Sequence, residues 1–194
     1  HSGTVHLTID GIAIQVPAGT TILQAAKKIG VNIPTLCHHP YLSEEGACRI
    51  CIVQVQGMRD FVASCAYPVN EGMEVLTHNP EIRQARRDIV ELILDNHPDE
   101  CHTCERDTNC ELQRLAYTMG VRTKHFKGEK KKYKRDDSSF AVVRDPEKCI
   151  LCERCVRVCD EIQGVCAIDM AHRGFKSVIV PAYELPFGES VCSS

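Results

Sequence analysis

The sequence lacks tryptophan and has few other aromatic residues, since phenylalanine and tyrosine together make up 5% of its 194 residues. This scarcity argues against a surface that stacks single-stranded bases, because such a surface needs several exposed rings. An excess of positive charge is also missing: 26 acidic residues outnumber 23 basic ones and leave a formal net charge of -3. Nucleic acid is therefore not expected as the main partner.

Several sequence signals are absent as well. No apolar run is long enough to predict a membrane span, and the first residues lack the charged segment, apolar stretch and cleavage site of a signal peptide. We also find no Ser-His-Asp set, no GxGxxG after a strand and no Walker-type loop. The sequence thus gives no support for a hydrolase, a direct nucleotide binder or a phosphotransferase, and it shows no catalytic centre of its own.

Cysteine is the abundant exception. Thirteen cysteines are present, and eleven of them fall into three tight groups. A secreted disulfide scaffold would be shorter, with an even cysteine count and a signal peptide, so that class does not fit. The tight spacing is typical of metal sites, and we interpret these residues as thiolate ligands in a reducing cytoplasm.

Alternating apolar residues predict strands near the amino terminus. Residues 5–16 alternate around Asp10-Gly11, a dipeptide typical of a hairpin turn, and a helical pattern follows from Ile22 to Gly30. A second hairpin is expected over 52–62, with a further strand over 74–76. This order indicates a β-grasp domain over residues 1–79.

The pattern becomes helical from residue 80. A long helix with Ile82, Ile89 and Leu92 on one apolar stripe is expected to end at Asn96-His97-Pro98. With a short helix at 111–119, it forms a predicted small helical domain at 80–121. The fold class is therefore α+β.

Two further segments complete the predicted organisation. Residues 122–140 are expected to form an exposed basic linker, because eight Lys or Arg between 122 and 135 face one Glu and give a local charge near +7. The last block, 141–194, contains four cysteines within eleven residues and a strand at 178–180.

The first cysteine group lies within the β-grasp pattern and has the spacing C-x10-C-x2-C-x13-C; its members are Cys37, Cys48, Cys51 and Cys65. Four thiolates suit a 2Fe-2S cluster, which takes two on each iron. The first interval is longer than in plant-type ferredoxins. A structural zinc ion bound by four cysteines is the alternative.

The second group follows the long helix as H-x3-C-x2-C-x5-C; its members are His97, Cys101, Cys104 and Cys110. Three thiolates and one imidazole predict a 4Fe-4S cluster. A neutral imidazole in place of a thiolate removes one negative charge, which should raise the reduction potential. His102 is the rival histidine, and a zinc site of three cysteines and one histidine is again the alternative.

The third group has the spacing C-x2-C-x2-C-x3-C of bacterial two-cluster ferredoxins; its members are Cys149, Cys152, Cys155 and Cys159. In such runs three cysteines bind one 4Fe-4S cluster and the fourth binds the other, whose second run would begin at Cys192. Either the chain is a fragment or these sites are incomplete, and a single cluster that uses Cys192 is a further alternative. Cys166 fits no ligand interval and is predicted to be a small buried residue.

These motifs, in this order, resemble the amino-terminal iron-sulfur region of iron-iron hydrogenases of the electron-bifurcating, NAD-linked type. The large iron-sulfur subunit of respiratory complex I and some formate dehydrogenases share this region. The resemblance covers essentially the whole chain and is carried by the segments 33–37 (IPTLC), 46–51 (GACRIC), 101–104 (CHTC), 109–113 (NCELQ) and 144–152 (RDPEKCILC). Where family members often have glycine, this chain has Cys166.

The resemblance implies a β-grasp 2Fe-2S ferredoxin-like domain, a small helical 4Fe-4S domain and a truncated two-cluster ferredoxin-like domain. It implies one 2Fe-2S cluster, one histidine-ligated 4Fe-4S cluster, and one or two further 4Fe-4S clusters completed by residues beyond 194. The implied partner is a flavin- and NAD-binding iron-sulfur subunit of a multi-subunit complex. Ferredoxin is an alternative partner, with the basic segment 130–135 as its docking site.

The function implied is one-electron transfer between such a partner and a hydrogenase catalytic unit. The hydrogenase active-site domain and the motifs of a molybdenum or tungsten cofactor are absent, so the same relay could serve a formate dehydrogenase or a complex I-like enzyme. Two other classes stay open. One is a zinc-stapled interaction scaffold, and the other is a regulatory or assembly subunit that holds clusters without passing electrons.

Overall fold

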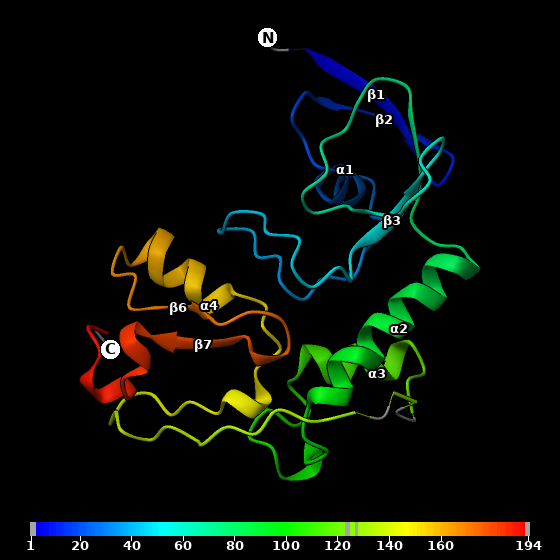
Figure 1. Ribbon diagram of the computed structural model, residues 1–194. Coiled ribbons are helices and arrows are strands. Elements are labelled where there is room, and N and C mark those ends of the chain that lie inside the picture. The colour runs from blue at the N-terminus through cyan, green and yellow to red at the C-terminus, as the bar shows by residue number, and fades with distance from the viewer. Residues whose placement is uncertain (1–2, 123–124, 127, 193–194) are drawn as a thin grey trace. The chain divides into compact units, whose positions relative to one another are not determined.

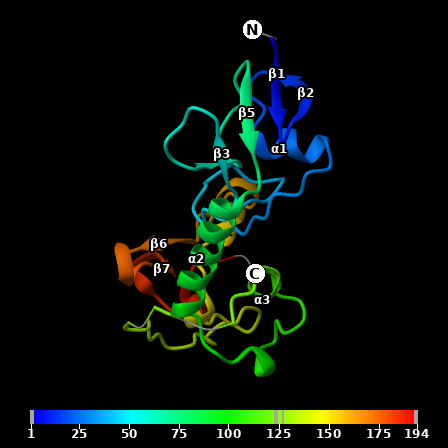
Figure 2. The same cartoon turned by 90° about the vertical axis from the view of Figure 1, so that its right-hand side faces the viewer.

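The computed structural model describes residues 3–122, 125–126 and 128–192 (Figures 1 and 2). The chain divides into two compact units. The first comprises 1–38, 44–90 and 111–122, and the second comprises 39–43, 91–110 and 123–194. Among the described residues, no helix combines the length and apolar character needed to cross a membrane.

The first unit begins with the predicted hairpin, β1 (Thr4–Ile9) and β2 (Ile12–Pro17), paired antiparallel so that Ile9 faces Ile12. Asp10 and Gly11 have φ values of 51° and 80°, as a tight hairpin turn that follows the strand twist requires. The Asp10 carboxylate also ties this turn to Thr77, because it accepts bonds from the backbone N–H and hydroxyl of that residue.

Helix α1 (Ile22–Lys28) begins at a capping box. The Thr21 hydroxyl accepts from the Gln24 backbone N–H, and the Gln24 side chain accepts from the Thr21 N–H, so two otherwise unpaired donors are satisfied. The helix ends just before Gly30, whose φ of 78° suits a helix terminus. Its buried face, which includes Ile22 and Ala25, packs in the same core as the sheet.

Three more strands complete the sheet: β3 (Ile52–Val55), β4 (Val62–Ala63) and β5 (Met73–Leu76). The strand order is β2-β1-β5-β3-β4, with β1 and β5 parallel and the other pairs antiparallel. Ile9, Val53 and Val75 are almost completely buried at the centre, and each contributes roughly 1.5–3 kcal/mol through burial. The predicted β-grasp domain is confirmed.

Helix α2 (Pro80–Asn96) ends where the sequence predicts. The Asn79 side chain caps its start by accepting from the Ile82 N–H over 2.7 Å. The predicted apolar stripe is partly wrong: Ile82 and Val90 are fully buried, but Leu92 is 51% exposed. Helix α3 (Glu111–Thr118) matches the second predicted helix and belongs to the first unit.

The second unit contains a two-stranded antiparallel sheet, β6 (Ile168–Ala171) and β7 (Val178–Pro181). The sequence predicts β7 but misses β6, because the Ile168–Ala171 segment is short and carries a polar residue. Helix α4 (Arg154–Arg157) continues into a wider turn of π type over Val158–Ile162. Such widened turns are frequent at functional sites.

The basic segment forms hydrogen bonds with other parts of the second unit. Among its described residues it forms no helix or regular strand, but Asp136 and Arg144 exchange two backbone hydrogen bonds of 2.8 Å. The Tyr133 N–H donates to Glu147, and Lys131 donates to the Ser177 carbonyl. These bonds fix the segment to the second unit. Residues 123, 124 and 127 of this segment lie outside the described residues.

We expect Thr21→Ala to destabilise α1 by about 1 kcal/mol, because it removes the oxygen that caps the Gln24 N–H. Hydrogen exchange of the α1 amides should then become faster. Thr21→Ser keeps the hydroxyl and should exchange as the unchanged protein does. If the α1 amides of Thr21→Ala exchanged at the same rate as in the unchanged protein, the cap would contribute nothing measurable to the stability of the helix.

Candidate metal centres

The four cysteines of the first predicted site come together in the loops around β3 and β4. Cys51 directly precedes β3, and Cys65 follows β4. Cys37, Cys51 and Cys65 are each only 1% exposed, and Cys48 is partly buried. The Cys37 backbone N–H points at the Cys48 sulfur, 3.4 Å away.

Hydrogen bonds link these thiols in a row, in the order Cys48, Cys37, Cys65 and Cys51, and separate their pKa values. A bond from Cys48, and then one from Cys65, lowers the pKa of Cys37 to about 2. A bond from Cys65 lowers the pKa of Cys51 to about 6. The pKa values of Cys48 and Cys65 rise, because each shares its proton with a neighbouring thiolate. Thiols that share protons in this way suit a cationic group that displaces the remaining protons.

The second predicted site lies beyond the end of α2. Cys101 begins a 3-10 turn (Cys101–Thr103), and Cys104 closes it by donating its N–H to the Cys101 carbonyl over 3.3 Å. The Arg106 N–H points at the Cys104 sulfur at 3.5 Å. Cys101, Cys104 and Cys110 are all partly buried.

The two candidate histidines of this site differ in their surroundings. His97 is partly buried, and its Nδ1 lies 3.0 Å from the Pro98 carbonyl oxygen. A carbonyl can only accept, so Nδ1 is the donor in this contact. This is the usual arrangement of a metal-ligating histidine, whose other ring nitrogen donates to a backbone carbonyl. His102 is exposed and, among the described residues, has no side-chain hydrogen bond.

The third group lies in the second unit, before and within α4. Desolvation raises the pKa of the Cys155 thiol, and the charges of Cys149 and Cys152 raise it further. The Leu151 N–H points at Cys149 Sγ at 3.4 Å. Cys159 lies in the π turn, where its sulfur accepts the Ala167 N–H at 3.1 Å.

Cys192 lies near the last described residues, with its N–H directed at the Ser190 hydroxyl over 3.3 Å. Among the described residues, no three His, Cys, Asp or Glu side chains are arranged as ligands of one metal ion. The thiol contacts described above are therefore pairwise or electrostatic.

Left-handed backbone occurs in each of the three ligand loops. Nine described non-glycine residues have positive φ, and four of them lie inside the three cysteine groups: Arg49, Thr108, Leu151 and Glu153. Such residues cost free energy and persist where the surroundings enforce them, typically at functional sites. Alternation of right- and left-handed residues turns successive N–H groups toward one point, which forms the anion-binding concavities found at many iron-sulfur sites.

A clamp that the sequence does not reveal joins the third group to residues 39–43, which belong to the same unit. The Arg157 side chain is 5% exposed, and its guanidinium donates to the carbonyls of Ser43 at 2.5 Å and Cys152 at 3.2 Å. Glu161 accepts from the Ser43 N–H at 2.8 Å and from its hydroxyl. The clamped residues 39–43 lie in the interval between Cys37 and Cys48.

The prediction for Cys166 is wrong. Its side chain is exposed, and the thiol donates to the Asp160 carboxylate over 2.9 Å. That bond is the main cause that raises its pKa. Its φ of 51° lies in the region that favours glycine, the residue that the resembling family often has there.

Comparisons with known proteins agree with this arrangement. Residues 2–80 match the family model of the 2Fe-2S iron-sulfur cluster binding domain. Residues 86–125 match the NADH-ubiquinone oxidoreductase-G iron-sulfur binding region, and residues 140–191 match the ferredoxin-like domain of NADH-quinone oxidoreductase subunit 3.

Curated relatives cover nearly the same residues. The chain is 39% identical over 97% of its length to the NADP-reducing hydrogenase subunit HndD of Solidesulfovibrio fructosivorans, and it spans 33% of that protein. It is 40% identical to an NADH-quinone oxidoreductase subunit from Streptomyces coelicolor, over 88% of the chain and 20% of that protein. The chain thus spans between a fifth and a third of these relatives.

A crystal structure of an NAD+-reducing [NiFe]-hydrogenase has a chain that superposes with a TM-score of 0.90 at 32% identity. The match covers 97% of this chain and 80% of that one. The predicted resemblance is confirmed: the chain belongs to the family of iron-sulfur electron-relay proteins that NAD(P)-linked hydrogenases share with complex I.

Proposed function

We propose that the chain passes single electrons, through at least three iron-sulfur clusters, between a flavin- and NAD(P)-binding partner subunit and a hydrogenase catalytic unit. When bound, the clusters supply the one-electron chemistry, and the side chains supply ligands and electrostatic tuning. The grouping of thiols and inward-facing N–H groups in each of the three ligand loops carries this proposal. The proposed domains are 1–79, 80–121 and 141–194, with 122–140 as the connecting segment.

For the first site we propose a 2Fe-2S cluster with Cys37 and Cys48 on one iron and Cys51 and Cys65 on the other. The support is the contact of Cys48 with Cys37 and of Cys65 with Cys51, while a third contact joins Cys65 to Cys37. A 2Fe-2S cluster needs two thiolates on each iron.

For the second site we propose a 4Fe-4S cluster bound by Cys101, Cys104, Cys110 and the Nε2 of His97. The Nδ1 contact to the Pro98 carbonyl supports this assignment. For the third group we propose a 4Fe-4S cluster on Cys149, Cys152 and Cys155, with Cys159 and Cys192 as ligands of a further cluster. The mutual influence of the first three thiols supports this grouping.

The comparisons favour a hydrogenase as the enzyme that this relay serves. The NAD+-reducing [NiFe]-hydrogenase chain is covered to 80% at a TM-score of 0.90, whereas the complex I-type relatives are covered to about a fifth. A complex I-like or formate dehydrogenase role is the second candidate, because the NADH-quinone oxidoreductase relative is equally similar in sequence. Ferredoxin stays an alternative electron partner.

We place the relay in the cytoplasm. No disulfide joins any of the thirteen cysteines, all of which the structure describes, as expected of thiols kept reduced for metal binding.

Anaerobically purified protein should be brown and should contain iron and acid-labile sulfide. The first two sites alone account for about six iron atoms per chain, from one 2Fe-2S and one 4Fe-4S cluster. Iron, sulfide and zinc analysis with electron paramagnetic resonance of the dithionite-reduced protein provides the measurement. A colourless protein that contains zinc and no sulfide would favour the interaction scaffold instead.

The relay itself is tested in the native complex. Reduction of every cluster at the rate of turnover, with hydrogen as the donor and NAD(P)+ as the acceptor, is the expected result. Clusters that stay oxidised during turnover would favour a regulatory or assembly role. Reduction by NADH but never by hydrogen would favour the complex I-like candidate.

His97→Cys should keep the second cluster and shift its midpoint potential to more negative values, because a thiolate adds one negative charge. His102→Ala is the matched control, and it should leave both the potential and the spectrum unchanged. Redox titration followed by electron paramagnetic resonance measures the two variants. A shift in His102→Ala with none in His97→Cys would assign the ligand to His102.

Arg86 provides a permanent positive charge near the first site. Its guanidinium is half-buried and donates to the carbonyl of Ile52, the residue after Cys51, over 2.7 Å. Burial lowers the pKa of Arg86, and the negative charges of Cys51 and Asp10 oppose that effect. Since reduction adds a negative charge to the cluster, this cation should favour the reduced state.

Arg86→Gln should therefore make the midpoint potential of the first cluster more negative. Unit charges roughly 10 Å apart interact by roughly 1–2 kcal/mol at an effective dielectric constant of about 20. A one-electron potential changes by about 59 mV for each tenfold change in equilibrium, so the expected shift is on the order of 50 mV. Arg59→Gln, at an exposed arginine of the same unit, is the control. Equal potentials in both variants would exclude this electrostatic role.

A further inference from the structure

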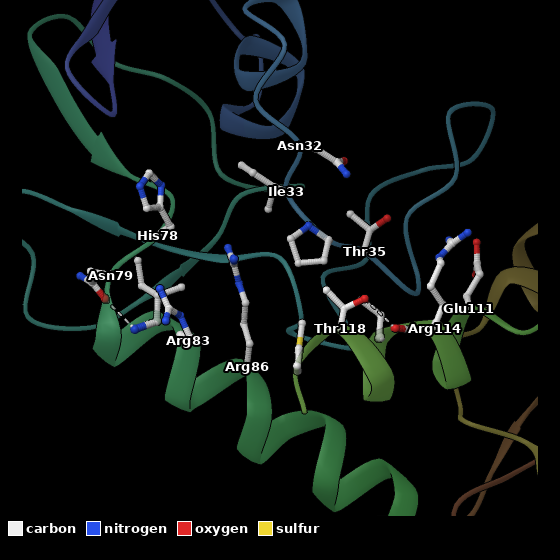
Figure 3. Close-up of a pocket in the computed structure, with 14 residues that line it drawn as sticks. Asn32, Ile33, Thr35, His78, Asn79, Arg83, Arg86, Glu111, Arg114 and Thr118 are labelled. Carbon is white, nitrogen blue, oxygen red and sulfur yellow. Dashed lines mark hydrogen bonds between the residues drawn. The ribbon is translucent and has the colours of Figure 1, made fainter. Parts of the chain in front are cut away.

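A cavity of about 760 Å³ lies within the first unit (Figure 3). Its walls are the loop 32–35, residues 78–79 and the helices α2 and α3. The volume falls in the range of sites that hold small organic ligands. None of the proposed cluster ligands lines this cavity, although Arg86 and Glu111 of its lining lie close to the first and second sites.

Positive charge dominates the lining. Arg83 and Arg86 are three residues apart on α2 and therefore share one face of the helix, and Arg114 lines the cavity from α3. Figure 3 shows the Arg86 side chain extending from α2 toward the wall that carries Ile33. Glu111 is the one carboxylate in the lining, so three guanidinium groups face a single negative charge.

Only some of the hydrogen-bond donors of these arginines are paired within the described residues of the protein. Arg86 donates one Nη2 bond to the Ile52 carbonyl, and its buried Nε has no hydrogen-bond partner among the described residues. Arg83 and Arg114 are exposed, and among the described residues neither forms an ion pair. Positive side chains that line one cavity make it favourable for an anion.

Other lining groups complete a polar wall. Asn32 and Thr35 add an amide and a hydroxyl on the side opposite α2 (Figure 3). The Asn79 side chain is not available, since it already accepts from the Ile82 N–H and donates to Gln54. Donors therefore face the cavity from at least two sides, which suits a ligand with several acceptor oxygens.

We propose that this cavity binds a multiply charged phosphate-type oxyanion, with Arg83, Arg86 and Arg114 as its cationic contacts. The planar guanidinium group, with its fork of donors, matches the oxygens of phosphate in two-point hydrogen bonds. Three guanidinium groups and Glu111 leave two positive charges in the lining, and a monovalent anion would balance only one of them. The favoured ligand thus carries two or more negative charges.

Binding is linked to the first cluster through Arg86, and this part of the inference rests on the proposed function. The guanidinium that contacts the anion also donates to Ile52, the residue after the proposed ligand Cys51. An anion on Arg86 offsets the positive charge that favours the reduced cluster. Occupation of the cavity therefore lowers the potential of the first cluster.

Calorimetric titration of the cluster-loaded protein with inorganic pyrophosphate, at constant ionic strength, tests the site. We expect saturable binding of one pyrophosphate per chain. The affinity should be at least roughly tenfold lower in the double variant Arg83→Gln/Arg114→Gln, because charge-assisted hydrogen bonds are stronger than neutral ones. Both positions are exposed, so the variant should fold. Arg59→Gln should bind as the unchanged protein does.

Two results would overturn the site: no saturable binding, or equal affinity in the double variant. Citrate serves as a comparison, and tighter binding of citrate would replace the phosphate class by carboxylates. A redox titration with and without pyrophosphate tests the link, and bound pyrophosphate that leaves the first cluster's potential unchanged would exclude it. Failure of the relay itself would appear separately, as clusters that are not reduced during turnover.

Discussion

The structure depends on one electrostatic constraint: thiolates must be gathered in a small volume, and their negative charge must be balanced. Left-handed residues within the ligand loops, such as Arg49 and Leu151, turn the backbone so that N–H groups face the sulfurs. In each of the three groups at least one N–H lies within 3.5 Å of a cysteine sulfur. The folded elements on either side hold these loops in a conformation that they would not adopt alone.

The three cysteine groups differ in their electrostatic surroundings. The first group is almost completely buried and has a half-buried arginine nearby, the second has a histidine whose Nδ1 contacts a carbonyl, and the third has the Arg157 clamp. Hydrogen bonds to sulfur, ligand charge and solvent exposure are the features that set the potentials of iron-sulfur clusters. Successive clusters in one chain can therefore have different potentials.

Much of this organisation follows from the sequence. Hydrophobic alternation predicts the β-grasp sheet, and cysteine spacing predicts the three groups, because both signals are local. Contacts between distant residues are not predictable in this way. The Arg157 clamp joins positions 114 residues apart, and a lone arginine beside a cysteine motif gives no sign of it. Cys166 is misjudged because its exposure depends on a left-handed turn that an apolar pattern does not encode.

Relatives with different named reactions share the region that this chain spans. Proteins named as an NADP-reducing hydrogenase, an NADH-quinone oxidoreductase and an NADPH-Fe(3+) oxidoreductase share this region at 39–40% identity. Their names specify different acceptors, so the shared region can contribute only what all of them need. That common requirement is a row of sites that accept and release one electron at a time. The direction of flow then follows from the potentials, which the residues around each cluster adjust without any change in the ligands.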